Sequence, residues 1–417
     1  MLTAILAVSA LLSLVAAILF QAPELLERDK VLTDFDAFYV AGLMANEGRA
    51  AEAYQATEML AAQEAFTGTT SFMPWAYPPP YTLLVKGLAR LPIGYAYLLF
   101  TWTSFIFYLL VLRRIAGDRL PGVLIAILPT IVLIMRTGQN GFLTAGLVGT
   151  FLLAFNQRRA VAGVPLGLMI IKPHLAAGIG LLALLGRRWM AMAIAAAIVL
   201  AAALAATAAF GLGIWEAFRG GMSEAGQFLV LGYYPLFRMI SLYAAVWASG
   251  GPVALAFAVQ AIGALAGIGL LLYVWSRNFA PRFVAAAACA TSLFVSPYGY
   301  DYDLPILGLG LAFVLPDLLS LSRPKELTGL LLLSWIATGY GLALNAVLEA
   351  FPGNESEVVT KLGTDVFPSL GGPALVLLIV ACCAILRRGG EAMVLADPPE
   401  AEGMPAHPAG RAELEPA

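Results

Sequence analysis

Residues 95–114 read YAYLLFTWTSFIFYLLVLRR, an apolar stretch with no charge before Arg113 and Arg114. A membrane-spanning helix needs about 20 mostly apolar residues, and Lys and Arg gather at its cytoplasmic end. The stretch therefore predicts a transmembrane helix that ends in the cytoplasm. The whole chain has the same character, because it is 60% hydrophobic and 12% charged, whereas a soluble domain has about 25% charged residues.

Composition and charge also exclude several classes of protein. The 24 Lys and Arg side chains balance 26 Asp and Glu side chains, for a net charge of −2, and a nucleic-acid partner would call for a basic surface. Three cysteines and two histidines are too few for a disulfide framework or a Cys/His zinc site. We therefore expect no nucleic-acid partner and no zinc or redox chemistry.

Further apolar runs flank this helix on both sides, and they predict an all-α polytopic protein with about twelve transmembrane or re-entrant helices. The first run has no basic residue before it and no convincing cleavage site, which predicts an uncleaved helix. Arginine pairs recur on one side of the predicted membrane, so both termini are expected in the cytoplasm. The few cysteines fit a bacterial cytoplasmic (inner) membrane. The runs cover residues 2–20, 120–135, 141–155, 160–172, 174–186, 189–210, 252–275, 282–296, 304–320, 327–348 and 370–386.

Two segments outside these runs set the domain organisation. Because the helix at 95–114 is predicted to end inside, residues 21–94 form a long first extracytoplasmic loop. From residue 389 onward the chain is rich in Pro and acidic residues with almost no aromatics, so it is predicted to be a disordered cytoplasmic tail, 389–417. The transmembrane domain is expected to cover residues 1–388.

One pass is predicted to be broken. The runs 160–172 and 174–186 are about 12 residues each, too short to span at 1.5 Å per residue, and Pro173 separates them. Irregular backbone at membrane depth is tolerated where it lines a polar cavity. Lys172 and His174 at this junction could pair with a phosphate, although a satisfied core histidine is the structural alternative.

Several charges are not explained by topology. Cytoplasmic arginines follow from orientation, whereas ionisable groups near membrane depth are costly and mark a functional site. The unexplained ones are Arg136, Lys172, Arg238, Asp34, Asp36, Asp301 and Asp303.

The first two carboxylates, Asp34 and Asp36, lie among aromatic residues in the first outer loop. Burial raises the pKa of a carboxylate toward the range in which it acts as a general base. Either residue is therefore a candidate base. In the structural alternative, Asp34 caps the helix that follows.

Two other motifs also have a functional and a structural interpretation. The stiff aromatic segment WAYPPPY at 75–81 could be a wall of a substrate site or an anchor at the membrane surface. In RTGQNG at 136–141, Arg136, Gln139 and Asn140 offer donors to an anion or to hydroxyls. The alternative is a polar hairpin turn.

The segment SPYGYDYD at 296–303 ends another run on the outer side. Tyrosines with Asp suit the recognition of sugar hydroxyls or the orientation of a catalytic group; an aromatic belt with surface acids is the alternative. Four of these motifs are predicted to share one outer or mid-membrane cavity. Carboxylates beside Lys, Arg and His there indicate chemistry on a substrate with an anionic phosphate and a lipid tail.

The order and spacing of the motifs resemble glycosyltransferase family 87. Five short motifs in the family's order are fairly specific, and the resemblance implies a GT-C-like fold. The matching motifs are Asp34-Phe35-x-x-Phe38-Tyr39-x-Ala41-Gly42, Tyr77-Pro78-Pro79, Gly138-Gln139-Asn140-Gly141-Phe142-Leu143, Lys172-Pro173-His174, and Pro297-Tyr298 with Tyr302-Asp303.

The resemblance implies an enzyme that transfers a sugar, often mannose and in some members arabinofuranose, from a polyprenyl-phosphate donor. The implied acceptor is a glycolipid or glycan outside the cytoplasmic membrane, and membrane lipids are the other expected partners. The lipid-linked sugar would serve as a co-substrate, and the resemblance implies no metal or other cofactor. The implied base of an inverting displacement is Asp34, with Asp36 as second choice. Lys172, His174 and Arg136 would hold the donor phosphate. Residues for the sugar and acceptor are Tyr77, Gln139, Asn140, Tyr298, Tyr302 and Asp303.

Two other functions stay open on the sequence. A transporter or flippase of a lipid-linked or anionic substrate would also use a broken helix and midplane charges, but the long first outer loop argues against it. A non-catalytic scaffold would leave the outer carboxylates without partners.

Overall fold

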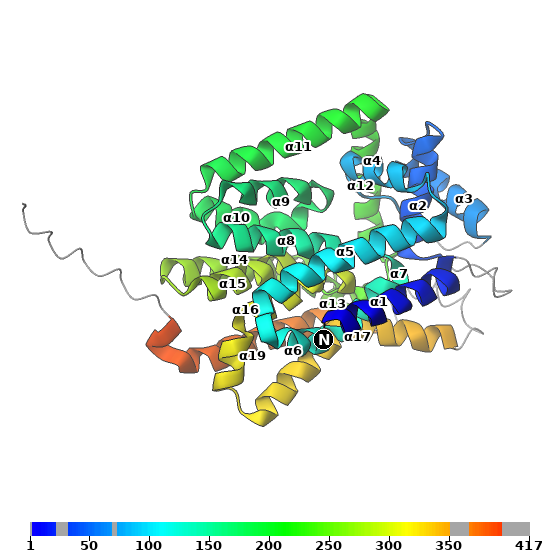
Figure 1. The fold of residues 1–417 in the computed structure, drawn as a ribbon. Helices are drawn as coiled ribbons and strands as arrows, with labels where there is room; N and C mark the ends of the chain where they lie inside the picture. The colour runs from blue at the N-terminus through cyan, green and yellow to red at the C-terminus, as the bar shows by residue number, and fades with distance from the viewer. Residues whose placement is uncertain (1, 22–31, 69–72, 351–366, 394–417) are drawn as a thin grey trace, which may run out of the picture.

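The computed structural model describes residues 2–21, 32–68, 73–350 and 367–393 (Figure 1). Regular structure in these residues is helical, apart from an isolated antiparallel bridge between Met239 and Tyr300. The predicted all-α class is confirmed for this part of the chain.

Five helices in the described residues are long and apolar enough to cross a membrane. On α11, Leu200 and Leu204 are each 60% exposed. Such a surface would be unfavourable in water and is stable against lipid chains, so the chain is a helical membrane protein. The five are α5 (Ile93–Ala116), which continues through η4 (Gly117–Arg119) into α6 (Leu120–Ala126), and α11 (Trp189–Phe210), α14 (Val253–Ser276), α17 (Pro324–Ala350) and α19 (Gly371–Leu386).

Shorter apolar helices pack between and beside these spans. α7, α15 and α16 each have a proline in the first turn, where the missing N–H costs no intrahelical hydrogen bond. The helix limits lie close to those of the apolar runs in the sequence. The shorter helices are α1 (Leu2–Ala16) with η1 (Ala17–Gln21), α7 (Leu128–Thr137), α8 (Gly141–Asn156), α15 (Pro281–Phe294) and α16 (Pro305–Leu321).

The predicted break at Lys172 is present. Lys172 has φ −146° and ψ 72°, outside the helical region, because a following proline disfavours helical backbone in the residue before it. Short 3-10 turns lie on both sides of the break. The elements in order are η5 (Ala160–Ala162), α9 (Gly163–Leu168), η6 (Met169–Ile171), η7 (Pro173–Ala176) and α10 (Ala177–Leu185).

The expected first outer loop is itself helical where the structure describes it. α2 (Asp34–Asn46), η3 (Glu52–Tyr54), α3 (Ala56–Thr67) and α4 (Pro79–Leu88) gather at one end of the bundle beside α12 (Gly213–Leu231) (Figure 1). α2 and α4 touch at Gly42, where a Cβ atom would overlap the carbonyl oxygen of Val85. The loop therefore forms a packed cap over this end of the bundle.

Two segments of the chain differ from the expectation. After α12, η8 (Leu236–Arg238) and α13 (Leu242–Ala248) bring the chain back into the bundle through a stretch for which no span was predicted. The predicted disordered tail begins inside η11 (Arg387–Met393), so its first residues are helical. Residues 394–417 lie outside the described part of the chain.

Candidate active site

The first turn of α2 holds two carboxylates with different roles. Both the backbone N–H and the hydroxyl of Thr33 donate to Oδ2 of Asp36, at 2.7 and 2.9 Å. This pairing closes the N-terminus of α2. The interpretation of Asp34 as the helix cap is therefore wrong, and Asp36, the second choice for the base, is engaged in helix structure.

The other carboxylate, Asp34, lies in a buried polar environment. Its Oδ1 accepts a hydrogen bond from Nε2 of Gln139 at 3.2 Å. Its Oδ2 accepts no hydrogen bond from the residues that the structure describes and lies 3.8 Å from the guanidinium of Arg238. A helix N-terminus also favours a nearby negative charge. Asp34 thus keeps a lone pair available to a proton donor.

The orientation of Gln139 is determined by its neighbours. Its Oε1 accepts hydrogen bonds from the hydroxyl of Tyr77 at 3.2 Å and from the backbone N–H of Asn140 at 2.8 Å. Since the amide oxygen takes both donors, the amide nitrogen faces Asp34. Burial raises the pKa of Tyr77 well above its usual value, so its hydroxyl stays protonated and donates.

The WAYPPPY segment packs against the protein, with Trp75 and Tyr81 buried and Tyr77 half-buried. Trp75 is 3% exposed, and Phe38 of α2 packs edge-on against Tyr77 and Tyr81, with ring centroids 5.3 and 5.4 Å apart. The interpretation as an anchor at the membrane surface is wrong for these rings. They form a rigid support that positions Tyr77 beside Gln139.

A buried arginine links two carboxylates from distant parts of the chain. Nε and Nη2 of Arg238 lie 3.4 and 3.3 Å from the two carboxylate oxygens of Asp301, and the same guanidinium faces Asp34. Burial raises the pKa of Asp301 to about 6, although the charge of Arg238 opposes the rise. The sequence singled out Arg238 as an unexplained charge but gave it no role, because no motif surrounds it.

A second ion pair lies at the helix break. Nζ of Lys172 is 2.6 Å from Oδ1 of Asp303, and both side chains are almost completely buried. Oδ2 of Asp303 accepts a hydrogen bond from the backbone N–H of Tyr300 at 3.2 Å. Breaking the helix at Lys172 therefore lets a cation from the α9–α10 pass meet a carboxylate from η9 (Asp301–Asp303).

Tyr302 connects the two ion pairs. Lys172 lies 4.4 Å and Arg238 5.8 Å from the centroid of its ring, distances at which a cation is attracted to an aromatic face. Tyr300 stacks on Tyr302 with centroids 5.0 Å apart, and Tyr298 packs on Tyr300 at 5.3 Å. The SPYGYDYD segment therefore contributes an aromatic stack rather than a surface belt.

The other two predicted phosphate ligands, His174 and Arg136, lie in different surroundings from each other. Nε2 of His174 is buried without a hydrogen-bond partner in the described residues, near Lys172 and Asp303. Arg136 lies over the ring of Phe20 in η1, 5.3 Å from its centroid. Arg238, to which the sequence analysis gave no role, lies beside Asp301 and Asp34.

Two glycines of the RTGQNG motif allow this close assembly. Gly138 ends α7 with φ +70°, a left-handed conformation that favours glycine, and a Cβ there would press on Phe35 beside Asp34. At Gly141 a Cβ would overlap the carbonyl oxygen of Tyr302. The start of α8 can therefore pack directly against η9.

The cluster holds more negative than positive charge. Lys172 and Arg238 face Asp34, Asp301 and Asp303. Asp34 is the carboxylate with the weakest pairing, because its nearest cation is shared with Asp301 at a shorter distance. The arrangement can accept a proton at Asp34 and present donors and cations around it.

Comparison with models of protein families places the chain among known proteins. The model of glycosyltransferase family 87 matches residues 75–297, more than half of the chain. No curated protein and no solved structure matches. The matched stretch contains Tyr77, Gln139, Lys172 and Arg238, while Asp34 precedes it and joins it through the contacts described above.

Proposed function

Because the chain belongs to glycosyltransferase family 87, we propose that it transfers a hexosyl residue, specifically mannose, from a polyprenyl-phosphate donor to a lipid or glycan acceptor. The observation that carries the proposal is the buried carboxylate of Asp34, whose Oδ2 accepts no hydrogen bond within the described residues. A glycosyl transfer to a hydroxyl needs such a group, since the hydroxyl must lose its proton as it attacks.

The proposed reaction is a single displacement with inversion. The acceptor hydroxyl gives its proton to Oδ2 of Asp34, and its oxygen forms a bond to the anomeric carbon. The bond from that carbon to the phosphate oxygen breaks, and polyprenyl phosphate leaves as an anion. Gln139 holds the other carboxylate oxygen, so Asp34 keeps one orientation during the transfer.

The donor phosphate is proposed to bind between the two ion pairs. Lys172, His174 and Arg238 are the basic or donor groups near this position, and cations placed there stabilise the charge that grows on the leaving phosphate. Each cation is already paired with a carboxylate, so the phosphate would compete with Asp303 and Asp301 for them. Arg136, which lies over the ring of Phe20, is the remaining candidate that the sequence indicates.

Sugar and acceptor hydroxyls are proposed to meet the polar groups around Asp34. Tyr77, Gln139 and Asn140 line one side, and Tyr298, Tyr302 and Asp303 the other. Hydroxyl and amide groups held by packed neighbours suit the orientation of a sugar, because little entropy is lost when they bind it.

We propose a GT-C-like topology of about twelve passes with both termini in the cytoplasm. The cap formed by α2, α3 and α4 would then lie outside the bacterial inner membrane, with the active site facing the extracytoplasmic side. The arginine pairs at the opposite helix ends support this orientation.

The test is transfer by purified protein in nanodiscs, using a short-chain polyprenyl-phosphate mannose with and without a membrane lipid extract. Release of polyprenyl phosphate should require the extract, which supplies the acceptor. Asp34→Asn should lower the rate by about 10²–10⁴-fold, the range of a general base, with an unchanged midpoint of thermal unfolding. Full activity of a folded Asp34→Asn protein, or donor binding without release from mannose or pentose donors, would contradict the proposal.

A further inference from the structure

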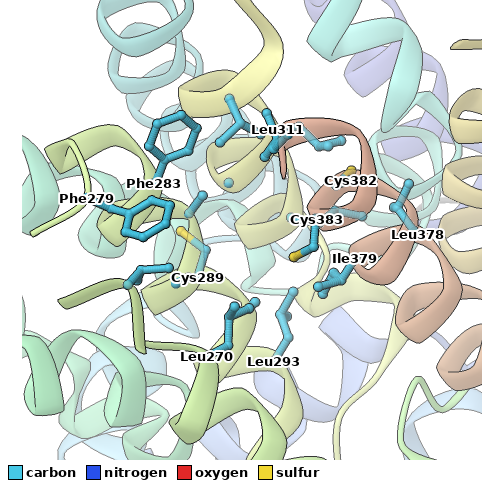
Figure 2. Close-up of a pocket in the computed structure, with 18 of the residues that line it drawn as sticks. Leu270, Phe279, Phe283, Cys289, Leu293, Leu311, Leu378, Ile379, Cys382 and Cys383 are labelled. Atoms are coloured by element: carbon cyan, nitrogen blue, oxygen red, sulfur yellow. The ribbon is translucent and has the colours of Figure 1, made fainter. Parts of the chain in front are cut away.

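A separate apolar pocket lies among the last helices of the bundle. Its volume is about 190 Å³, and side chains of α14, α15, α16 and α19 line it. Figure 2 shows Phe279 and Phe283 on one wall and Ile379 and Cys383 on the other. Since an engineered apolar cavity of about 150 Å³ stays dry and binds benzene, this pocket has room for a segment of hydrocarbon chain.

One charged side chain lines the pocket. Arg387, at the end of α19, is exposed and forms no ion pair with the residues that the structure describes. Two nearby arginines, in contrast, each have a carboxylate partner. Arg282 donates to Asp317 at 2.8 and 2.9 Å, and Nη1 and Nη2 of Arg388 each donate to Glu326 at 2.7 Å. A cation that has no carboxylate partner among the described residues and lies beside an apolar pocket is placed to pair with an anionic group.

The pocket rim and the candidate active site lie at opposite ends of α16. Arg388, next to Arg387, donates to the carbonyl of Leu321 at the C-terminal end of this helix, whereas Asp303 lies two residues before its first residue, Pro305. A helix of 17 residues is about 25 Å long. A lipid with its phosphate at Arg387 therefore does not present that phosphate to Asp34 or Lys172.

We propose that this pocket binds one acyl chain of an anionic phospholipid, with the lipid phosphate against Arg387. α14 and α19 are candidate membrane spans, so the chain enters from the surrounding bilayer. Tyr273, 52% exposed, stands at the rim and gives an amphipathic side chain near the headgroup. This site is additional to glycosyl transfer and does not depend on it.

The test is photo-crosslinking of the full-length protein in nanodiscs with a phosphatidylglycerol that carries a diazirine near the end of one acyl chain. The crosslinked peptides, identified by mass spectrometry, should contain the pocket residues of α15 and α19, several-fold above the yield from a phosphatidylcholine with the same chains. Arg387→Gln should lower this preference about fivefold, the effect of one basic residue near an anionic lipid. Arg388→Gln, a matched removal of one arginine that is already paired, should leave it within twofold.

A second pair of variants tests the pocket itself. Cys383→Phe places a ring in the pocket and should abolish the crosslinks, whereas Leu377→Phe, on an exposed position of the same helix, should retain them. The native cysteines give an independent readout, because the chain has three and all line the pocket. Phosphatidylglycerol should slow their alkylation by N-ethylmaleimide, and phosphatidylcholine should not.

Three results would overturn the proposal. One is crosslinks spread evenly over all lipid-facing helices and unaffected by Cys383→Phe. Another is equal yields from the two phospholipids in the native protein. A third is displacement of phosphatidylglycerol by a short-chain polyprenyl phosphate at equal concentration, which would make the occupant an isoprenoid.

Discussion

Asp34 and Asp36 are only two residues apart, yet their surroundings give them different roles. Asp36 is the third residue of α2, from which a side chain folds back onto the N-terminal cap, where Thr33 donates to it. Asp34 is the first residue, and its side chain reaches the α7–α8 turn at Gln139. A difference of two positions in a helix turn therefore separates a structural carboxylate from a candidate base.

Asp36→Ala should destabilise the protein without removing activity. Loss of a helix cap costs about 1 kcal/mol, and the base would stay in place. We expect a lower midpoint of thermal unfolding in detergent and a transfer rate within about threefold of the native rate per folded molecule, a small change beside the 10²–10⁴-fold contribution of a general base. A rate loss as large as that of Asp34→Asn would assign the base to Asp36.

Asp301 should make the folded protein less stable as the pH rises, the opposite of the usual effect of a carboxylate. Burial raises its pKa from 3.8 to about 6 in the folded protein, so the folded state binds the proton more tightly than the unfolded chain. Its contribution to stability is complete below about pH 4 and is lost as the pH rises through about 6. The shift in pKa corresponds to a contribution on the order of 3 kcal/mol to the free energy of unfolding at low pH.

Asp301→Asn should remove this pH dependence. The native protein should gain stability relative to the variant as the pH falls from 7 to 4, since other titrating groups are common to both. Thermal unfolding of the two proteins in detergent at several pH values measures the difference. A constant difference across this range would show that Asp301 stays ionised in the folded state.

At the level of elements, the site depends on how closely α8 approaches η9. Gly141 at the start of α8 touches the backbone of Tyr302, and Thr130 of α7 donates to the carbonyl of Asp301 at 2.7 Å. These contacts hold the SPYGYDYD segment against the RTGQNG turn. Two motifs that are far apart in the sequence thus form one surface.

Gly141→Ala should separate these elements. The added methyl group would overlap the carbonyl oxygen of Tyr302, and overpacking of this kind costs about 1–3 kcal/mol. We expect a lower unfolding temperature and a lower transfer rate. Gly180→Ala in α10, where a Cβ meets nothing within 4 Å, is the control and should be neutral or stabilising. Equal behaviour of the two variants would contradict the close contact.

The break at Lys172 joins the α9–α10 pass to η9. Lys172→Met should cost about 3–5 kcal/mol, because it leaves Asp303 buried without its partner, whereas an apolar replacement of both members is often tolerated. The double variant Lys172→Met, Asp303→Leu should recover much of the stability but not the transfer rate. Thermal unfolding and transfer assays separate the two effects, and recovery of both would make the pair purely structural.

Over the whole molecule, charges divide between the two ends of the bundle. The buried cluster around Asp34 begins on α2, within the cap, while arginine pairs end or follow α5 (Arg113 and Arg114), α10 (Arg187 and Arg188) and α19 (Arg387 and Arg388). The apolar sides of α5, α11 and α14 face outward between them. This distribution is what a lipid bilayer requires of a polytopic protein.

Cysteine labelling should establish the orientation. Leu212→Cys, at an 80% exposed position after α11, should react with a membrane-impermeant maleimide added outside intact cells. Asp118→Cys in η4, an exposed position after Arg113 and Arg114, should react only after the cells are opened. The native protein is the control, and the reverse pattern would invert the topology.

Sequence alone was sufficient for the membrane class and for most helix limits, because apolar length and the placement of arginines are local properties of the chain. It also identified the break at Pro173, which follows from backbone geometry. Packing determined the rest. Arg238 carries no motif and becomes part of the site because η8 returns it to Asp301 and Asp34. Arg136, equally charged, lies against Phe20 instead. Partners so distant in the chain are chosen by three-dimensional burial, in which each buried charge must find an opposite one, and no local pattern encodes that choice.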